Sequence, residues 1–193
     1  MRCKVFAILI VIASACSKPS QEDEMYDAVN QVIQGLEGEG WAAEGKPSYN
    51  YILDKPTVSP TSSMEGMDKV LLEETTRKYF SEEDISVLRA QVKEYKNTMY
   101  DTKRIANKKL ISTQKLQQLA ESDWKNLWNV YEQEYGKTGY YNISFPIFSV
   151  DKSKMLVSIE YCGFRGSSSG GIHIYIKKDN KWVFWKTLSS FLS

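Results

Sequence analysis

The sequence predicts an α+β fold in which several N-terminal helices are followed by a C-terminal antiparallel four-stranded meander. Apolar residues recur at steps of three and four up to residue 136, which is the spacing of one helical face. From residue 139 the period changes to two, as expected of half-buried strands. We therefore expect a single domain at residues 25–193, with its helical part at 25–136 and its sheet at 139–189.

Five helices account for the apolar spacing of the first part. Acidic residues at the start of the first helix suit the helix dipole, and glycines end it. Ser81 and Asp84 are spaced as a capping box at the start of the third, and Gly136 is a plausible stop for the fifth. Residues 37–65 are irregular apart from a short strand at 49–53. The helices are expected at residues 23–36, 67–79, 81–99, 112–119 and 122–135.

Four strands account for the second part. Pro146 marks an edge or a bulge in the first strand, because proline cannot donate to the ladder. Asp179 and Asn180 have the residue types that a two-residue hairpin turn needs, since both tolerate positive φ. The glycine- and serine-rich run 166–171 is expected to be a flexible hairpin loop and not a phosphate site, because a strand follows it. The strands are expected at residues 140–150, 155–162, 172–178 and 181–188.

The N-terminus has the organisation of a targeting segment. Arg2 and Lys4 precede an apolar run at residues 5–13, which is too short to span a bilayer, and small residues then lead to Cys16. Residues 16–24 contain serine, proline and an acidic cluster, so we expect them to form a flexible tether. An ordinary secretory signal, which would leave a free thiol at Cys16, and a membrane-spanning anchor are the alternatives.

This N-terminal arrangement resembles a bacterial lipoprotein signal peptide, here residues 1–15. The resemblance implies cleavage before Cys16 and lipidation of its thiol, so that the chain is anchored in a membrane of the cell envelope. Ser17 is not the Asp that retains lipoproteins of enteric type in the inner membrane, so the expected location is the outer membrane, on its periplasmic or its outer side. The acidic cluster at 22–24 resembles the export tag of some surface lipoproteins.

Charge and cysteine content limit the partners. The whole chain has a formal net charge of +1, and removal of the signal peptide leaves 23 basic and 24 acidic residues. Such a near-neutral chain has no general attraction to nucleic acid, so we expect no nucleic-acid partner. Cys162 is the only cysteine after Cys16, and His173 is the only histidine. One Cys and one His fall short of a four-ligand zinc site, and we expect neither a metal nor a cofactor.

Cys162 and His173 are the candidate catalytic residues, with Glu160 as a residue that orients the imidazole. Alternation places Val157 and Ile159 on one face with Ile172 and Ile174, and therefore places the three candidates together on the other face. Two registers fit: one sets Glu160 opposite His173, and the other sets Cys162 there. The same face is expected to carry candidate binding residues, with Phe184 across from Tyr175 and Lys186 across from His173: Tyr175, Lys177, Trp182 and Phe184.

The Cys–His pair would suit a hydrolase or transferase that uses an activated thiolate. No oxyanion pocket or substrate cleft is visible in the sequence, however, and Lys186 beside His173 would disfavour an imidazolium. Simple packing within the sheet is the alternative, because cysteine is commonly a small buried hydrophobe.

The C-terminal third resembles the tail of a group of uncharacterised secreted bacterial lipoproteins. Their pattern is a Ser-x-Pro strand, an Asp-Lys turn, a Tyr-Cys-Gly strand end, a glycine-rich loop and a closing Lys-Trp hairpin. It maps here onto Ser144, Pro146, Asp151, Lys152, Tyr161, Cys162, Gly163, Gly170, Gly171, Lys181 and Trp182. The resemblance implies no activity. A looser similarity, to nuclear-transport-factor-2-like cone folds, rests on helices followed by aromatic hairpins.

These observations favour a membrane-anchored lipoprotein that is non-catalytic and binds a small-molecule ligand or a protein partner. A cysteine/histidine-dependent hydrolase or transferase is the first alternative. The second is an immunity or inhibitor lipoprotein that acts on a secreted toxin or enzyme.

Overall fold

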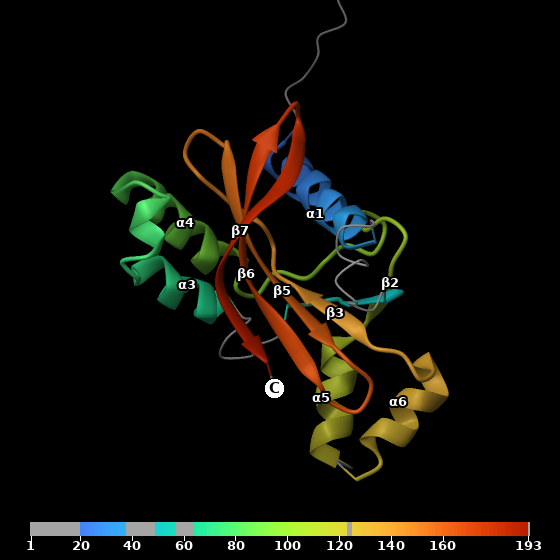
Figure 1. Ribbon diagram of the computed structural model, residues 1–193. Coiled ribbons are helices and arrows are strands. Elements are labelled where there is room, and N and C mark those ends of the chain that lie inside the picture. The colour runs from blue at the N-terminus through green and yellow to red at the C-terminus, as the bar shows by residue number, and fades with distance from the viewer. Residues whose placement is uncertain (1–19, 38–48, 57–63, 123–124, 193) are drawn as a thin grey trace, which may run out of the picture.

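The computed structural model describes residues 20–37, 49–56, 64–122 and 125–192 (Figure 1). Its described part contains five α-helices, one short 3-10 helix and seven strands that form one sheet. The helices are α1 (Gln21–Glu37), α3 (Met64–Leu72), η1 (Thr76–Lys78), α4 (Glu82–Tyr95), α5 (Thr113–Ser122) and α6 (Leu127–Tyr135). The strands are β1 (Tyr51–Leu53), β2 (Lys109–Ile111), β3 (Tyr140–Ile143), β4 (Ile147–Phe148), β5 (Lys154–Cys162), β6 (Ser168–Lys178) and β7 (Lys181–Leu192).

The α+β class is confirmed, but the four-stranded antiparallel meander is wrong in strand number and order. The strands lie in the order β2-β1-β3-β5-β6-β7, and β4 pairs with β5 outside this path. β1 runs parallel to both β2 and β3, whereas the pairs among β3 to β7 are antiparallel. The sheet is therefore mixed. β1 lies within the short strand expected at 49–53, whereas β2, at the edge of the sheet, lies in the part of the chain that was expected to be helical.

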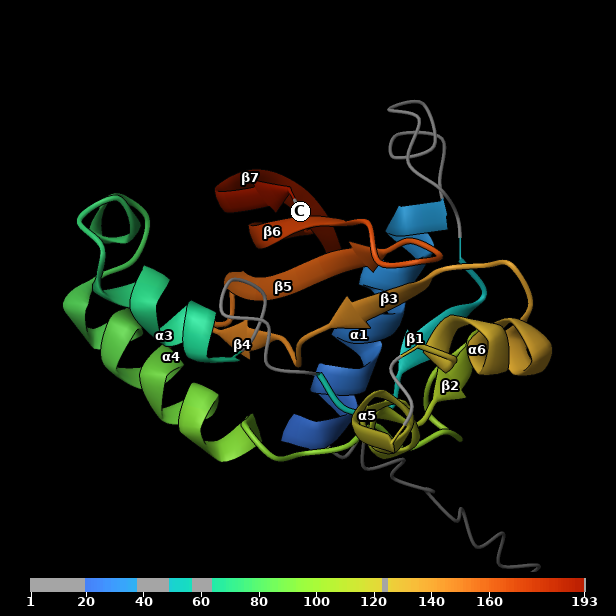
Figure 2. The ribbon, with the colours of Figure 1, turned by 90° about the horizontal axis from the view of Figure 1, so that it is seen from below.

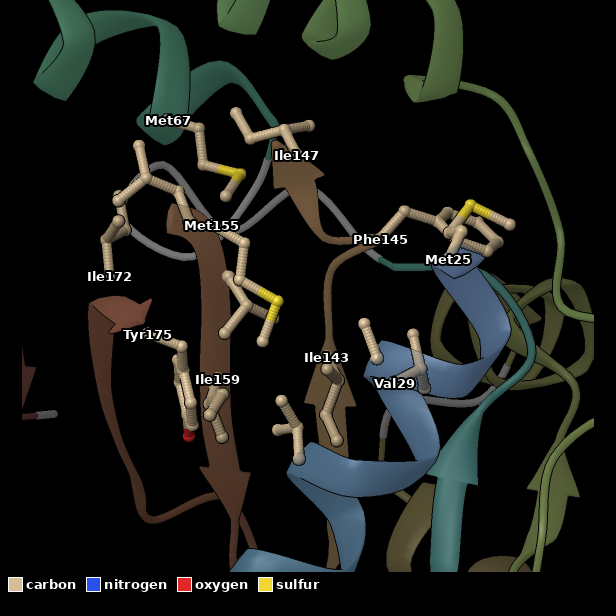
Figure 3. Packing of buried hydrophobic residues seen from close by; sticks show 14 of the residues in the cluster. Met25, Val29, Met67, Ile143, Phe145, Ile147, Met155, Ile159, Ile172 and Tyr175 are labelled. Atoms are coloured by element: carbon tan, nitrogen blue, oxygen red, sulfur yellow. The ribbon is translucent and has the colours of Figure 1, made fainter. Parts of the chain in front are cut away.

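Helices cover both faces of the sheet. α1 packs its apolar side against one face, where Met25 lies beside Phe145 and Val29 faces Ile143 (Figure 3). Figure 2 shows α3 and α4 at one end of the sheet and α5 and α6 at the other. Because both faces are covered, β5 is buried at every position from Met155 to Tyr161.

The core has two parts. The larger cluster joins α1, α3 and α4 to the central strands. The smaller one lies under α5 and α6, where Leu53, Ile111 and Tyr131 are buried together. Leu53 and Ile111 are opposite each other in the parallel pair of β1 and β2, so this short pair forms the floor on which α6 packs.

Several local predictions are confirmed. Ser81 and Asp84 form a reciprocal capping box at the start of α4. Gly136, with φ of 83°, follows α6 as its C-cap. Asp179 and Asn180 adopt φ of 48° and 60° in the two-residue turn between β6 and β7, as the type I′ geometry requires.

Other boundaries differ from the predictions. α1 begins at Gln21, so the last four residues of the expected tether are helical, and residues 16–19 lie outside the described part. Ser20 and Asp23 cap this helix reciprocally: the Ser20 N–H donates to the Asp23 carboxylate at 3.2 Å, and the Asp23 N–H donates to Ser20 Oγ at 3.1 Å. The helix expected at 67–79 is instead α3 followed by η1. The strand expected at 140–150 is broken into β3 and β4 around Pro146.

The glycine- and serine-rich run is mostly strand and not a loop. β6 begins at Ser168, and Gly170 and Gly171 pair with both β5 and β7. A Cβ atom on Gly171 would lie 2.3 Å from the Ser189 carbonyl oxygen, and one on Gly170 would lie 2.4 Å from that of Ile159. Glycine is therefore needed here for close strand packing. The chain reversal is confined to residues 163–167.

Candidate functional site

Neither predicted register between β5 and β6 is present. His173 lies opposite Val157, Glu160 opposite Gly170 and Cys162 opposite Ser168. Directly opposed residues in an antiparallel pair share a face, so His173 shares a face with Val157, whereas Glu160 and Cys162 are on the other face. The expected grouping of the three candidates is wrong. A shift of one residue in the register moves every side chain of a strand to the other face of the sheet.

Cys162 and His173 are also far apart along the strands. Val157, the partner of His173, precedes Cys162 by five residues on β5, which corresponds to roughly 17 Å at about 3.3 Å per residue. Catalysis by a thiolate–imidazole pair needs the two groups within hydrogen-bond reach. The structure thus does not bring together the Cys–His pair on which the hydrolase or transferase hypothesis depends.

His173 is a packed residue on the α1 side of the sheet. It is buried, its Nδ1 lies 3.0 Å from Thr187 Oγ1, and its ring contacts the Phe184 ring edge-on. Tyr175, the next residue on this face, is also buried, and burial raises the pKa of its hydroxyl. Phe184 lies opposite Tyr175 as predicted, but a register shift places Lys186 opposite Ile174 and not opposite His173.

The remaining candidate binding residues lie near the turn between β6 and β7. Lys177 is exposed, and its Nζ is 5.5 Å from the centre of the Trp182 ring, which lies opposite it. The Trp182 ring packs on Phe148, and the backbone N–H of Trp182 donates to Gln31 Oε1 of α1 at 2.7 Å. These contacts fix the turn to α1. None of the four candidates lines the cavity described next.

A cavity of about 840 Å³ lies on the opposite face, between the sheet and the helices α5 and α6. Strand β1 and the residues after it contribute Leu53 to Pro56, and α5 and α6 contribute mainly apolar walls. The sheet contributes Tyr140, Glu160 and Cys162, and the turn before β6 closes one side. The apolar and aromatic part of the lining is Leu53, Pro56, Met99, Leu116, Ala120, Leu127, Trp128, Tyr131 and Tyr140.

A chain of polar side chains crosses the sheet side of the cavity. Tyr140 lies opposite Cys162, and Asn142 lies opposite Glu160, in the β3–β5 pair. The Tyr140 hydroxyl donates to the Cys162 sulfur, the thiol donates to the Glu160 carboxylate, and Asn142 Nδ2 donates to Glu160 Oε2 at 2.9 Å. Strand pairing therefore holds a buried carboxylate at a fixed position beside the cavity.

Burial and this carboxylate keep the Cys162 thiol protonated. Burial is the largest cause of its raised pKa, and the negative charge of Glu160 raises the pKa further. A raised pKa is the opposite of what an activated nucleophile requires. The structure places Cys162 in the cavity wall as a neutral hydrogen-bonding group.

Tyr131 is the second polar feature of the cavity. It is 1% exposed, and its hydroxyl has no hydrogen-bond partner within the described part of the chain. Burial raises the pKa of this hydroxyl, so it stays a neutral donor and acceptor. The Tyr131 ring packs against Trp128 at 5.7 Å and Tyr140 at 6.1 Å between ring centroids. Its hydroxyl therefore carries the free-energy cost of a buried polar group without a partner among the described residues.

Two hydrogen bonds at the edge of the cavity join the residues after β1 to the start of α5. The Thr113 N–H donates to Asp54 Oδ1 at 2.8 Å, and the Thr113 hydroxyl donates to the Lys55 carbonyl oxygen at 2.9 Å. These bonds tie α5 to the end of β1. They keep the cavity walls in place, although the two segments are far apart in the sequence.

Sequence reasoning missed this cavity as a site. Its residues come from separate segments near positions 54, 116, 130 and 160, and none of these segments contains a motif. Trp128, Tyr131 and Tyr135 are spaced by three and four residues within the helix expected at 122–135, which is also the pattern of an ordinary buried helix face. The one available signal was Glu160, a charged residue within a strand that is otherwise almost entirely apolar.

The described ranges contain no group of three or more His, Cys, Asp or Glu side chains placed to hold a metal ion. None of the helices within those ranges has the length and hydrophobicity needed to cross a membrane. No protein-family model, curated protein or solved structure matches the chain.

Proposed function

We propose that the chain is a lipid-anchored lipoprotein of the cell envelope, at the outer membrane, whose domain binds a small organic molecule in the cavity beneath α5 and α6. The observation that carries the binding proposal is the cavity itself. Its volume of about 840 Å³ lies within the range of small-molecule sites, about 300–1,000 Å³. Apolar and aromatic walls with a few fixed polar groups are also typical of such sites.

The position of Cys162 and His173 favours binding over thiol chemistry. The thiol beside the cavity has a raised pKa, and the imidazole is on the other face of the sheet. Binding needs neither group to change its charge. The hydrogen-bonded side chains of Tyr140, Cys162 and Glu160 orient a ligand, and the apolar walls of the cavity exclude water.

A cavity-filling variant tests the binding proposal. Ala120 lines the cavity from α5, and Ala90 is exposed on α4, so Ala120→Phe and Ala90→Phe add the same side chain inside and outside it. We expect compounds that raise the melting temperature of the wild-type chain and of Ala90→Phe to have no effect on Ala120→Phe. Compounds that stabilise all three proteins equally would place binding elsewhere and contradict the proposal.

The anchoring proposal rests on the resemblance at Cys16 and is tested separately. We expect the wild-type chain to sediment with membranes and to enter the detergent phase, and Cys16→Ala to remain in the aqueous fraction. Recovery of both proteins in the aqueous fraction would contradict lipid anchoring. It would leave the cavity proposal unaffected, because no residue of the cavity lies near Cys16 in the sequence.

A further inference from the structure

We infer that the end of the β6–β7 hairpin, residues 177–186, is a docking surface for an anionic phospholipid membrane, which binds headgroups through its lysines and inserts its exposed apolar side chains between them. The inference goes beyond the proposed function, because this surface includes neither Cys16 nor any residue of the cavity. Lys177, Trp182 and Phe184, three of the binding candidates predicted from the sequence, belong to it.

The hairpin end carries a positive charge that the rest of the chain lacks. Four lysines and one aspartate within residues 177–186 sum to +3, whereas the whole chain carries +1. All four lysines are exposed, and none of them forms an ion pair within the described ranges. They are Lys177, Lys178, Lys181 and Lys186, and the aspartate is Asp179. Each lysine near an anionic membrane surface increases partitioning onto it by about fivefold, so this surface attracts anionic lipid.

Three consecutive apolar side chains are exposed between these lysines. Val183, Phe184 and Trp185 are 42%, 42% and 44% exposed. The Phe184 ring packs edge-on against Tyr175 and the Trp185 ring packs edge-on against Tyr79, so the fold holds both rings in place at the surface. Aromatic rings and lysines together suit a membrane–water interface, because the rings lie at the level of the headgroups while the lysine stems extend the charge toward the phosphates.

The geometry of β7 favours a lipid surface over a strand from another protein. β7 is the last strand in the described sheet, and Figure 2 shows it on the outer side, away from α5 and α6. Two register shifts in its pairing with β6 leave Trp185 and Leu188 as extra residues on β7. Bulges and lysines on an edge strand are the features that prevent another strand from pairing with it, whereas a fluid lipid surface requires no backbone register.

The hairpin end lies on the same side of the domain as the first turn of α1. The Lys177 backbone N–H donates to the Ser153 carbonyl oxygen at 2.8 Å, which joins the hairpin to the turn between β4 and β5. Lys152 of that turn forms an ion pair with Glu24 of α1. Figure 1 shows the β6–β7 turn and the start of α1 at the same end of the sheet. A lipid at Cys16, which is the separate anchoring proposal, would therefore hold the hairpin end near the same membrane.

The acidic residues near this end are offset by basic neighbours, so they do not cancel the charge of the hairpin. They are Glu22 and Asp23 with Arg104, Glu24 with Lys152, and Asp151 with Lys154.

Vesicle sedimentation tests the inference with the full chain carrying Cys16→Ala, which has no acyl chain to hold it on a membrane. The probes are vesicles of phosphatidylcholine alone and vesicles in which about a third of the lipid is phosphatidylserine. We expect binding to the anionic vesicles to be about a hundredfold tighter, at about fivefold for each of three net charges, and to weaken as added salt screens the charges. The neutral vesicles measure any contribution of the apolar run at residues 5–13.

Two pairs of lysine substitutions localise the effect. Lys178→Gln with Lys181→Gln removes two exposed charges that lie opposite each other beside the turn. We expect the affinity for anionic vesicles to fall by roughly twentyfold, at about fivefold per lysine. Lys109→Gln with Lys125→Gln makes the same change in net charge at exposed residues of β2, on the opposite edge of the sheet, and of the connection between α5 and α6. This control pair is expected to change the affinity by less than about twofold, because screening confines the attraction to charges near the membrane.

A third variant tests the apolar part of the surface. Trp185→Ser is expected to weaken binding several-fold without changing its salt dependence, because the ring contributes by burial and not by charge. An unchanged affinity would overturn the insertion of the apolar side chains. Circular dichroism establishes that each variant is folded, and if Trp185→Ser is not, the exposed lysine pairs decide the inference by themselves.

The remaining outcomes are equally direct. Equal binding to both kinds of vesicle, no binding to either, or equal losses in the two lysine pairs would overturn the inference and would assign the exposed apolar residues to contact with a protein. No outcome affects the proposals on lipidation or on the cavity, because the tested chain has no acyl chain and none of the substituted residues lines the cavity.

Discussion

Replacing Tyr131 by phenylalanine is expected to stabilise the protein, although it removes a polar group from the interior. The Tyr131 hydroxyl is buried and has no partner among the described residues. Burying a polar group without a partner costs about 1–3 kcal/mol. We therefore expect Tyr131→Phe to raise the free energy of unfolding by about 1 kcal/mol, which corresponds to roughly 2–4 °C in melting temperature for a domain of this size.

Tyr140 supplies the matched control. It lines the same cavity, but its hydroxyl donates to the Cys162 sulfur. Tyr140→Phe loses that bond and leaves the sulfur without its donor, so we expect a decrease of about 1 kcal/mol in the free energy of unfolding. The two substitutions are chemically identical, and their opposite signs follow only from the partner of each hydroxyl.

Urea denaturation followed by tryptophan fluorescence measures both changes, and calorimetry gives the melting temperatures. The wild-type chain must be free of bound ligand, because a ligand that binds the native state adds its own stabilisation. A decrease of 1 kcal/mol or more for Tyr131→Phe would show that the hydroxyl has a partner in the folded protein. The expected stabilisation by Tyr131→Phe would then be wrong, whereas the binding proposal, which rests on the cavity itself, would be unaffected.

Three further predictions concern ionisation and local structure. Iodoacetamide is expected to label native Cys162 at least about tenfold more slowly at pH 7 than in urea, because the raised pKa keeps the thiolate scarce; fast native labelling would contradict this. Hydrogen bonds from Ser153 and Ser149 lower the pKa of Asp151 to about 2, so its stabilising contribution is complete above pH 4 and is lost as the pH falls toward 2; Asp151→Asn is expected to flatten the stability profile in that window, and an unchanged profile would refute it. Ser81→Ala removes the N-cap of α4 and is expected to cost about 1 kcal/mol in urea denaturation; a loss below about 0.3 kcal/mol would show that the cap is dispensable.

The sequence predicted well those features that depend on a few neighbouring residues. The capping box at Ser81, the C-cap at Gly136 and the hairpin turn at Asp179 and Asn180 each follow from the backbone preferences of the residues involved. The class of the fold followed from the change of period near residue 139. These signals are local, so no knowledge of the tertiary structure was needed to interpret them.

The faces of β5 and β6 could not be predicted because both are buried. Alternation identifies a buried face only when the other face is polar, and β5 has Leu156 and Ser158 buried on one face as fully as Val157 and Ile159 on the other. A second cause lies in the glycines. Gly170 and Gly171 extend β6 toward the turn, and this extension sets a register that apolar residues alone did not indicate.

The parallel pairing of β1 with β2, and the cavity that depends on it, could not be predicted from the sequence for a different reason. A short strand was predicted at 49–53, where β1 lies, but β1 and β2 have three residues each, which is too short to indicate which strands they pair with. Their pairing brings Leu53 and Ile111 together across more than fifty residues of chain. The cavity depends on that pairing, since α5 follows β2 directly and is tied to Asp54 through Thr113.

The early start of α1 limits where the domain can work. Under the proposed lipidation, Ser20, where the helix cap begins, is only four residue steps from Cys16, and even a fully extended chain of that length reaches only about 14 Å. The acidic first turn would then lie close to the lipid headgroups, with Glu22 and Asp23 paired to Arg104 of the folded domain. Under that proposal, a domain held this closely would meet a ligand at the membrane surface and would not reach the aqueous space beyond it.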